Sequence, residues 1–334
     1  MAFLQDLSPE GAPERTLPVL QAVDLAFRTA ALDGERPLEV EVVPFDTEGS
    51  PETAAAIADE VATGEGFVAA IAAPDLSGQA ALVDALSGAG VPLISLSGRG
   101  SVGAVRPGTW VRLVAPVEDQ ARALAETVSN LRRAGSGVCL VAAPPDGTTF
   151  ARTVRRSLPG DLEVTEVEGA GAAAEAGCGV AIWTGDAAGA AELATALAAS
   201  SPEGPVLAGG PTLLDPVFLE EAGAAAEGAI AVCSCADLST SLELAAQRFI
   251  QDFQSEHGSP PGPYAVEGWD AATLVIAALR AGEPADPDLA AWLATRAEVD
   301  GLGGPYPLAA GELAEPGSLV RGFRVRGGRW LEGG

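Results

Sequence analysis

Two apolar runs in the first third of the chain are each followed directly by a short polar segment. The residues that could bind a small molecule there are Asp75, Ser77, Ser97 and Arg99. Serine hydroxyls donate hydrogen bonds, and arginine pairs with a carboxylate through two parallel N–H groups. Serine also serves as a turn or helix-cap residue, and a loop arginine is often solvated, so these alternatives stay open. The residue types predict a site for a small polar or anionic molecule.

Several classes of chemistry are excluded by residues that the chain lacks. All 19 basic residues are arginine, so no lysine is present for a Walker loop, for pyridoxal phosphate or for a Schiff base. The only histidine, His257, lies in a turn-rich polar segment, where a solvated side chain is the usual outcome. Hydrolytic triads and metal sites built from His and Cys are therefore unsupported. We expect no catalysis, no cofactor and no metal.

Composition favours a globular chain of two domains. The 334 residues are 48% hydrophobic, and the formal net charge is -27. A chain of this length can bury two cores of ordinary size. Strong acidity without a basic cluster repels phosphates, so nucleic acid is excluded as a partner. No apolar run approaches the roughly 20 residues that cross a bilayer.

Alternating apolar and helical segments predict the elements that would position the polar residues. Within residues 66–101 the pattern is strand, turn, helix, turn, strand and loop. This pattern is typical of a βαβ unit in a parallel sheet. Open parallel sheets bind ligands beyond the carboxyl ends of their strands, where the polar segments of this stretch would lie.

The same pattern recurs in the second half of the chain. Residues 179–211 repeat the stretch 66–101, and in this alignment Asp75 corresponds to Asp186. The two strands expected upstream of the first stretch also recur in the same order. The alternative is a chance similarity between alanine-rich helices. The repeat predicts an α/β fold of two doubly wound parallel-sheet lobes that face each other.

Local signals set the bounds of several elements. Ser50 followed by Pro51 predicts the N-terminus of a helix. A strand is expected over residues 38–45, a helix over 288–299, and a terminal hairpin over 319–331.

One glycine motif imitates a dinucleotide site. Residues 98–103 read GRGSVG, which matches GxGxxG after a strand. A dinucleotide fingerprint would follow the first strand and open a helix, whereas this one follows the fourth and precedes Pro107–Gly108. Nucleotide binding is therefore not expected.

The four cysteines are Cys139, Cys178, Cys233 and Cys235. The first two open strands that would lie side by side in a doubly wound sheet, so they could form a disulfide. Four cysteines allow three pairings, and buried free thiols in strands are an equally good alternative.

Several motifs in order resemble the type I periplasmic substrate-binding proteins, in particular the branched-chain amino acid receptors of ABC transporters. These motifs are Val43–Asp46 with Ser50–Ala54, Gly90–Ser95, Arg112 with Glu118–Gln120, Gly268–Ala272, and Gly301–Pro305. Each motif alone is weak, but their order and spacing cover essentially the whole chain.

The resemblance implies two lobes joined by three crossovers, with a ligand cleft between them. Lobe one would comprise residues 1–115 and 240–315, and lobe two residues 116–239 and 316–334. The function implied is a monomeric, non-enzymatic solute-binding protein that delivers an amino acid-like ligand to an ABC transporter membrane permease. A regulatory ligand sensor of the same fold, signalling through a partner, is the alternative.

The resemblance also implies an extracytoplasmic location, in the periplasm or as a cell-surface lipoprotein. Met1 leads directly into the first expected strand without a signal segment. From the residues alone, the protein is either cytoplasmic or a mature chain to which Met1 was added.

In lobe one, the family holds the carboxylate of an amino acid in the loops after the third and fourth strands. The matching residues here are Asp75, Leu76, Ser77, Ser97, Gly98 and Arg99.

In lobe two, the family places aromatic residues after the first and third strands and an acid after the fourth. The matching positions here are Asp146, Asp186 and Gly210, so the acid is missing and two aspartates replace the aromatics. We expect these aspartates to hold an ammonium or amide group of the ligand, with Phe150 or Trp183 shielding it. The alternative is that each aspartate caps the helix that follows it.

Overall fold

The structure of the protein is a computed structural model. It describes residues 1–7, 13–32, 37–74, 76, 79–100, 105–131, 137–141, 147–200, 205–281, 289–309 and 311–333. The chain divides into two compact units. Unit 1 comprises Met1–Pro116 and Cys235–Pro316, and unit 2 comprises Val117–Ser234 and Gly317–Gly334. The chain therefore passes from one unit to the other three times.

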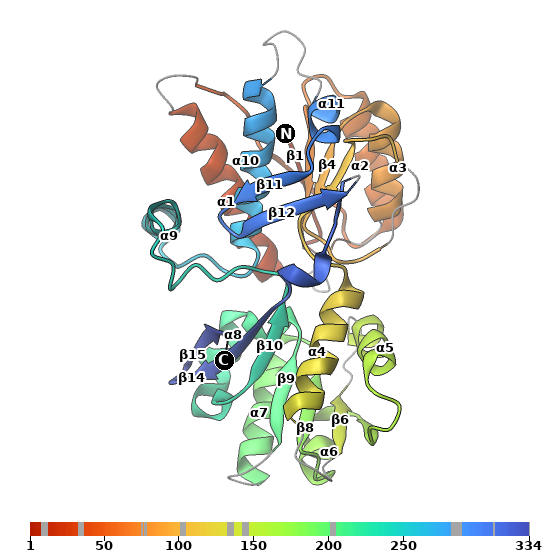
Figure 1. The fold of residues 1–334 in the computed structure, drawn as a ribbon, viewed down its shortest axis with the longest axis vertical. Coiled ribbons are helices and arrows are strands. Elements are labelled where there is room, and N and C mark those ends of the chain that lie inside the picture. The colour runs from red at the N-terminus through yellow and green to blue at the C-terminus, as the bar shows by residue number, and fades with distance from the viewer. Residues whose placement is uncertain are drawn as a thin grey trace. The chain divides into compact units, whose positions relative to one another are not determined.

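Unit 1 contains a five-stranded parallel sheet with helices on its faces (Figure 1). Its strands are β1 (Ala2–Gln5), β2 (Val43–Asp46), β3 (Ala70–Ala72), β4 (Leu93–Ser95) and β5 (Trp110–Arg112). Its helices are α1 (Pro13–Ala31), α2 (Pro51–Thr63), α3 (Gln79–Ala89), α9 (Leu244–His257), α10 (Ala265–Ala281) and α11 (Leu289–Ala294). The strand order β2-β1-β3-β4-β5 is that of a doubly wound fold.

The core of unit 1 forms because its central strands are apolar on both faces. Leu4, Ala70 and Leu93 are fully buried, and α2 and α3 pack against this cluster through Val61 and Leu86. Burial on both faces is typical of parallel sheets, whose crossover helices cover each side.

The sequence signal for the start of α2 is confirmed. The Ser50 Oγ atom accepts a hydrogen bond from the Thr53 backbone N–H at 3.2 Å, and Pro51 occupies the first turn. Ser50 thereby satisfies one of the backbone donors that a helix N-terminus leaves without an intrahelical partner.

Unit 2 repeats the strand order of unit 1 and adds a hairpin. Its strands are β6 (Val138–Val141), β7 (Val164–Val167), β8 (Val180–Trp183), β9 (Val206–Gly209), β10 (Ile230–Cys233), β14 (Arg321–Arg326) and β15 (Arg329–Glu332). Its helices are α4 (Val117–Leu131), α5 (Gly147–Ser157), α6 (Gly169–Glu175), α7 (Ala187–Ser200) and α8 (Pro216–Ala222). The parallel part runs β7-β6-β8-β9-β10, which is the order of unit 1. The repeat in the sequence is therefore a repeat of topology, and the α/β doubly wound prediction is confirmed.

Two predicted elements differ from the structure. The strand expected over residues 38–45 begins only at Val43. The Leu38 N–H instead donates to the Ala30 carbonyl at the end of α1, at 3.3 Å. The helix expected over residues 288–299 ends at Ala294. The chain then enters a small antiparallel sheet of β11 (Glu298–Gly301), β12 (Gly304–Ala309) and β13 (Glu312–Leu313).

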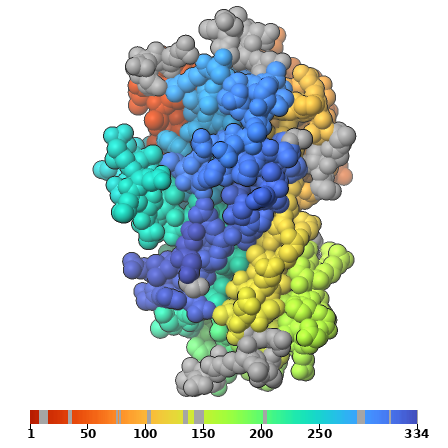
Figure 2. Space-filling model, in the orientation of Figure 1, coloured from red at the N-terminus to blue at the C-terminus, as the bar shows by residue number. Residues whose placement is uncertain are grey.

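The sequence did not reveal this small sheet, which belongs to unit 1. Glycines at both ends of the connection between β11 and β12 favour a tight turn over a continued helix. The two strands (blue) run across one face of unit 1 in Figure 1, and blue atoms cover this face in Figure 2. The terminal hairpin, in contrast, was predicted and is present as β14 and β15.

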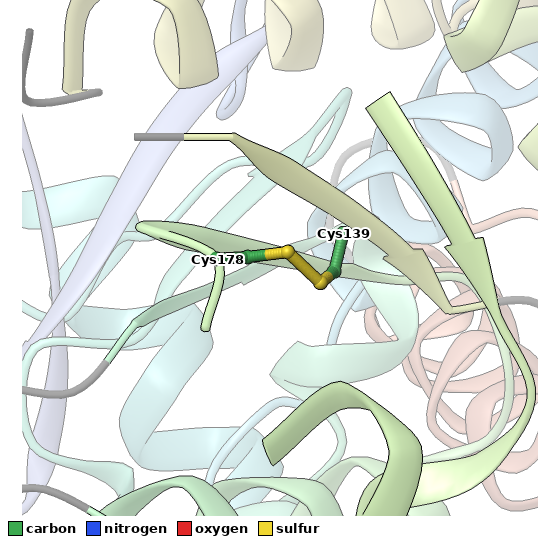
Figure 3. Close-up of a disulfide and its surroundings, with 2 residues drawn as sticks. All are labelled: Cys139 and Cys178. Atoms are coloured by element: carbon green, nitrogen blue, oxygen red, sulfur yellow. A yellow bond between two sulfur atoms is a disulfide. The ribbon is translucent and has the colours of Figure 1, made fainter. Parts of the chain in front are cut away.

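A disulfide links two neighbouring strand segments of unit 2. Cys139 lies in β6 and Cys178 lies just before β8, with their Cα atoms 5.7 Å apart (Figure 3). Cys233 and Cys235 are disulfide-bonded as well, so the chain has no free cysteine. Of the alternatives that the sequence left open, the structure therefore selects disulfides.

We expect loss of the Cys139–Cys178 bridge to destabilise unit 2. The bridge joins residues 39 apart, and closing a loop of this size in the unfolded chain is worth about 4 kcal/mol in the chain-entropy model. Replacing both cysteines with alanine should lower the free energy of unfolding by about 2–4 kcal/mol, measured by urea denaturation. The Cys139→Ala single variant is the control, because it should lose nearly as much as the double variant. A double variant as stable as the wild type would contradict this role.

Candidate ligand-binding site

The carboxyl ends of β3 and β4 lie side by side in unit 1, because these strands pair in parallel with Ala72 opposite Ser95. The ends of the two strands that precede the predicted segments of unit 1 therefore lie at the same edge of the sheet. Asp75 and Ser77 lie outside the described residues. Leu76 is described, and its side chain is only 1% exposed within the core of unit 1.

A chain of hydrogen bonds organises the segment after β4. The Ser97 N–H donates to Ser95 Oγ at 3.1 Å, and the Arg99 N–H donates to Ser97 Oγ at 3.2 Å. Ser95 and Ser97 are fully buried, whereas Gly98 and Arg99 are partly exposed. The two serines therefore act on the backbone of their own segment and present Arg99 at the strand end. This is the turn chemistry that the sequence left open for Ser97.

A buried arginine holds the far end of the same segment. Arg112 closes β5 and is 3% exposed, and its Nη2 atom donates to the Gly100 carbonyl at 2.7 Å. Its Nη1 atom lies 3.6 Å from Glu312 Oε2, and the Trp110 indole N–H donates to Glu312 Oε1 at 2.9 Å. A buried charge that keeps a partner and hydrogen bonds can fix local geometry. Arg112 thus ties the candidate segment to β13.

In unit 2, three of the predicted residues lie at the carboxyl ends of β8 and β9, and Phe150 lies in α5. The Asp186 Oδ1 atom accepts a hydrogen bond from the Gly189 N–H at 2.7 Å, so this aspartate caps α7. The Trp183 indole N–H donates to the Asp186 carbonyl at 2.6 Å, and Trp183 is 6% exposed. At least one carboxylate oxygen of Asp186 therefore caps a helix, as the alternative interpretation of the sequence predicts.

Phe150 and Gly210 meet at the same end of unit 2. A Cβ atom at Gly210 would lie 3.0 Å from a ring carbon of Phe150, so the ring covers this glycine directly. The position that would carry the family's acid thus faces an aromatic ring in this chain. Asp146 lies outside the described residues.

A second buried charge joins two motifs that are far apart in the sequence. Asp270 in α10 is 1% exposed and accepts hydrogen bonds from the Leu302 N–H at 2.7 Å, the Gly303 N–H at 2.9 Å and the Tyr306 hydroxyl at 2.7 Å. Burial raises the pKa of Asp270, and the three hydrogen bonds offset part of this effect. A Cβ atom at Gly301 would collide with the carboxylate, which explains why glycine is needed there.

Three further features of the described residues concern the histidine, metal-binding groups and membrane spans. His257 ends α9 and packs against the Phe253 ring, with the ring centroids 4.7 Å apart. Among the described residues, no group of three or more His, Cys, Asp or Glu side chains could hold a metal ion. None of the described helices combines the length and apolar character that a membrane span requires.

Comparison with known proteins identifies the class. A family model for the periplasmic binding proteins matches residues 1–325, so the chain belongs to this family. The family and its fold are those of non-enzymatic solute-binding receptors. A search of curated protein sequences found no match.

Solved structures share the whole fold at low sequence identity. A leucine-binding protein, LivK, of Thermotoga maritima is 17% identical, with a TM-score of 0.77 over 100% of this chain and 97% of that one. A Rhodopseudomonas palustris solute-binding protein in complex with benzoate is 20% identical, with a TM-score of 0.75 over 100% and 94%. Streptococcus pneumoniae LivJ in complex with isoleucine is 18% identical, with a TM-score of 0.72 over 99% and 98%. The chain therefore has the type I periplasmic binding protein fold.

We expect the carboxyl group of Asp270 to make stability depend on pH. Well below pH 3.8, its ordinary pKa, the group is protonated in both the folded and the unfolded chain and carries no penalty. As the pH rises, the unfolded chain loses its proton first, so this group destabilises the fold until the pH passes its raised pKa.

The Asp270→Asn side chain cannot titrate. The free energy of unfolding of this variant, relative to that of the wild type, should therefore increase as the pH rises from about 4 to 8. Urea denaturation at several pH values measures the difference. Asp270→Ala is the control. Its free energy of unfolding should depend on pH as that of Asp270→Asn does, and should be lower at every pH. Parallel pH curves for Asp270→Asn and the wild type would show that the carboxyl does not titrate abnormally.

Proposed function

We propose that this protein is an extracytoplasmic solute-binding protein that delivers a small polar ligand to an ABC importer. The ligand class is an amino acid or a related amine or amide, and the two lobes close on it by hinge bending. Support comes from the family, from the type I fold, and from the three passages of the chain between units. The single observation that carries the proposal is the hydrogen-bonded segment after β4, which presents a partly exposed arginine at a strand end.

Arg99 is the residue proposed to bind an anionic group of the ligand. Its backbone is held by Ser97, and Gly100 beside it is held by Arg112, so the segment is fixed at two points before ligand arrives. Benzoate and isoleucine, the ligands of two similar proteins, both carry a carboxylate. An arginine pairs with such a group through two parallel hydrogen bonds.

The unit 2 residues are proposed to complete the site from the facing lobe. Asp186 uses one carboxylate oxygen to cap α7, and its side chain is exposed, so it can also accept from a ligand ammonium. Phe150 covers Gly210 and would supply an apolar wall. Trp183 would add to this wall, and Asp146 is proposed as the second acceptor.

Binding of ligand and closure of the lobes form one prediction. In a thermal-shift screen of amino acids, amides and amines, at least one compound should raise the melting temperature of the protein. Ligand at one hundred times its dissociation constant adds about 2.7 kcal/mol to the free energy of unfolding. Small-angle scattering with that compound should then show a smaller radius of gyration. D-enantiomers serve as controls. No stabilising compound, or binding with an unchanged radius, would contradict transport by hinge closure.

Arg99→Ala should weaken binding of the compound that the screen identifies by at least about tenfold, or 1.4 kcal/mol, in calorimetric titration. Asp186→Asn should also weaken it, because asparagine keeps an oxygen to cap α7 but loses the charge. Arg296→Ala is the control, since Arg296 is an exposed arginine of unit 1 that stacks on Trp292. If Arg99→Ala binds within about twofold of the wild type, Arg99 does not pair with the ligand.

A further inference from the structure

Gln79 lies at the candidate site, although its position at the head of a helix gave no signal of this in the sequence. It is the first residue of α3 and follows the β3 loop, opposite the segment after β4. Its side chain is only 4% exposed. The Gln79 Nε2 atom donates to Ser95 Oγ at 2.5 Å. The same amide group is therefore joined to the serine network that shapes the segment carrying Arg99.

The carbonyl oxygen of the same amide, in contrast, makes no such bond to the described residues. Gln79 Oε1 is buried and has no hydrogen-bond partner in the part of the chain that the structure describes. A buried carbonyl without a partner costs free energy, and native proteins rarely keep one without a reason.

Ser95 cannot supply the missing hydrogen bond. Its hydroxyl oxygen already accepts from Gln79 Nε2 and from the Ser97 N–H, and its one hydrogen points to the Ser97 carbonyl at 3.5 Å. If the side-chain amide were rotated by 180°, Oε1 would accept a hydrogen bond from the Ser95 hydroxyl and Nε2 would lack a partner instead. In either orientation of the amide, one polar atom of Gln79 is left to bind another molecule. The orientation in the structure keeps all three hydrogen bonds of Ser95.

The free oxygen faces the predicted binding segment. A Cβ atom at Gly100 would lie 4.0 Å from Gln79 Oε1, and among the described residues, apart from the adjoining ones, this is the one contact within 4 Å. Gly100 is exposed and has a positive φ of 76°, which a side chain would strain. The glycine therefore keeps side-chain atoms away from the space beside the carbonyl.

We propose that Gln79 is a specificity-determining residue whose Oε1 atom accepts a hydrogen bond from an N–H or O–H group of the ligand. The inference rests on the proposed function of the same site. The oxygen is buried in this structure, so binding requires a small local movement that uncovers it. The ligand must then carry a donor beside the group that Arg99 binds. An α-amino acid meets this requirement with its ammonium and carboxylate groups, whereas a simple carboxylate such as benzoate does not.

The acceptor also supplies what unit 2 lacks. The family's acid for the ligand amine is replaced by Gly210 in this chain, and that glycine is covered by Phe150. A neutral carbonyl in unit 1 would take over part of that role. The expected preference is for L-leucine over benzoate.

The test uses Gln79→Met and Gln79→Glu with L-leucine and benzoate as probes in calorimetric titration. Methionine has a similar shape without polar hydrogen bonds, so Gln79→Met should weaken L-leucine binding at least tenfold and change benzoate binding less than twofold. Glutamate keeps an acceptor, and Ser95 can donate to it, so Gln79→Glu should bind L-leucine within threefold of the wild type. Loss of L-leucine binding in Gln79→Glu would show that the outward group is a donor and would overturn the assignment.

Stability of the ligand-free variants separates this role from a structural one. Gln79→Met removes a partnerless carbonyl together with one hydrogen bond, so its urea midpoint should equal or exceed that of the wild type. Gln120→Met, at another buried glutamine on α4, is the matched control and should lower the midpoint. A Gln79→Met variant that binds L-leucine within twofold, or that loses stability as the control does, overturns the proposal.

If the wild type binds neither probe, L-leucine is not its ligand, and the urea midpoint of Gln79→Met decides. A raised or equal midpoint then supports a group reserved for a ligand, and a lowered midpoint refutes it.

Discussion

Burial of the parallel strands on both faces is the constraint on which the rest of this structure depends. Strands such as β3 and β6 are entirely buried, so polar side chains along them would lose water without compensation. Polar residues are therefore displaced to the turns at the strand ends. In each unit the carboxyl ends of neighbouring strands lie together, which gathers Ser97 and Arg99 in unit 1 and Asp186 in unit 2. The position of the candidate residues thus follows from the packing of the sheets.

The fold could be predicted from the sequence because its determinants are local and repeated. Apolar runs of strand length alternate with helical segments, and the two halves of the chain share this order, so both sheets were expected to have one topology. The prediction was wrong where a distant partner decides the local structure. Leu38 bonds to Ala30 at the end of α1 and lies outside the strand, and the segment after Ala294 becomes a strand because it pairs with β12. Neither partner is visible in a local pattern.

The candidate site was predictable in position but not in detail. Strand-end loops are recognisable by turn residues, so Ser97 and Arg99 could be selected from the sequence. Gln79 could not, because its proposed role depends on how Ser95 uses its hydroxyl group. The buried charges show the same limit. Arg112 meets Glu312 across 200 residues, and Asp270 meets a loop 32 residues away. These contacts hold the small sheet of unit 1 in place, and only the folded chain brings them together.

A crystal structure of the protein bound to the most stabilising amino acid, amine or amide tests the central claim most directly. We expect the ligand's density to contact the segment from Ser97 to Gly100, with its anionic group against Arg99 and a hydrogen-bond donor directed at Gln79. A ligand bound elsewhere on the protein, with this segment unchanged and without contact to it, would contradict the account.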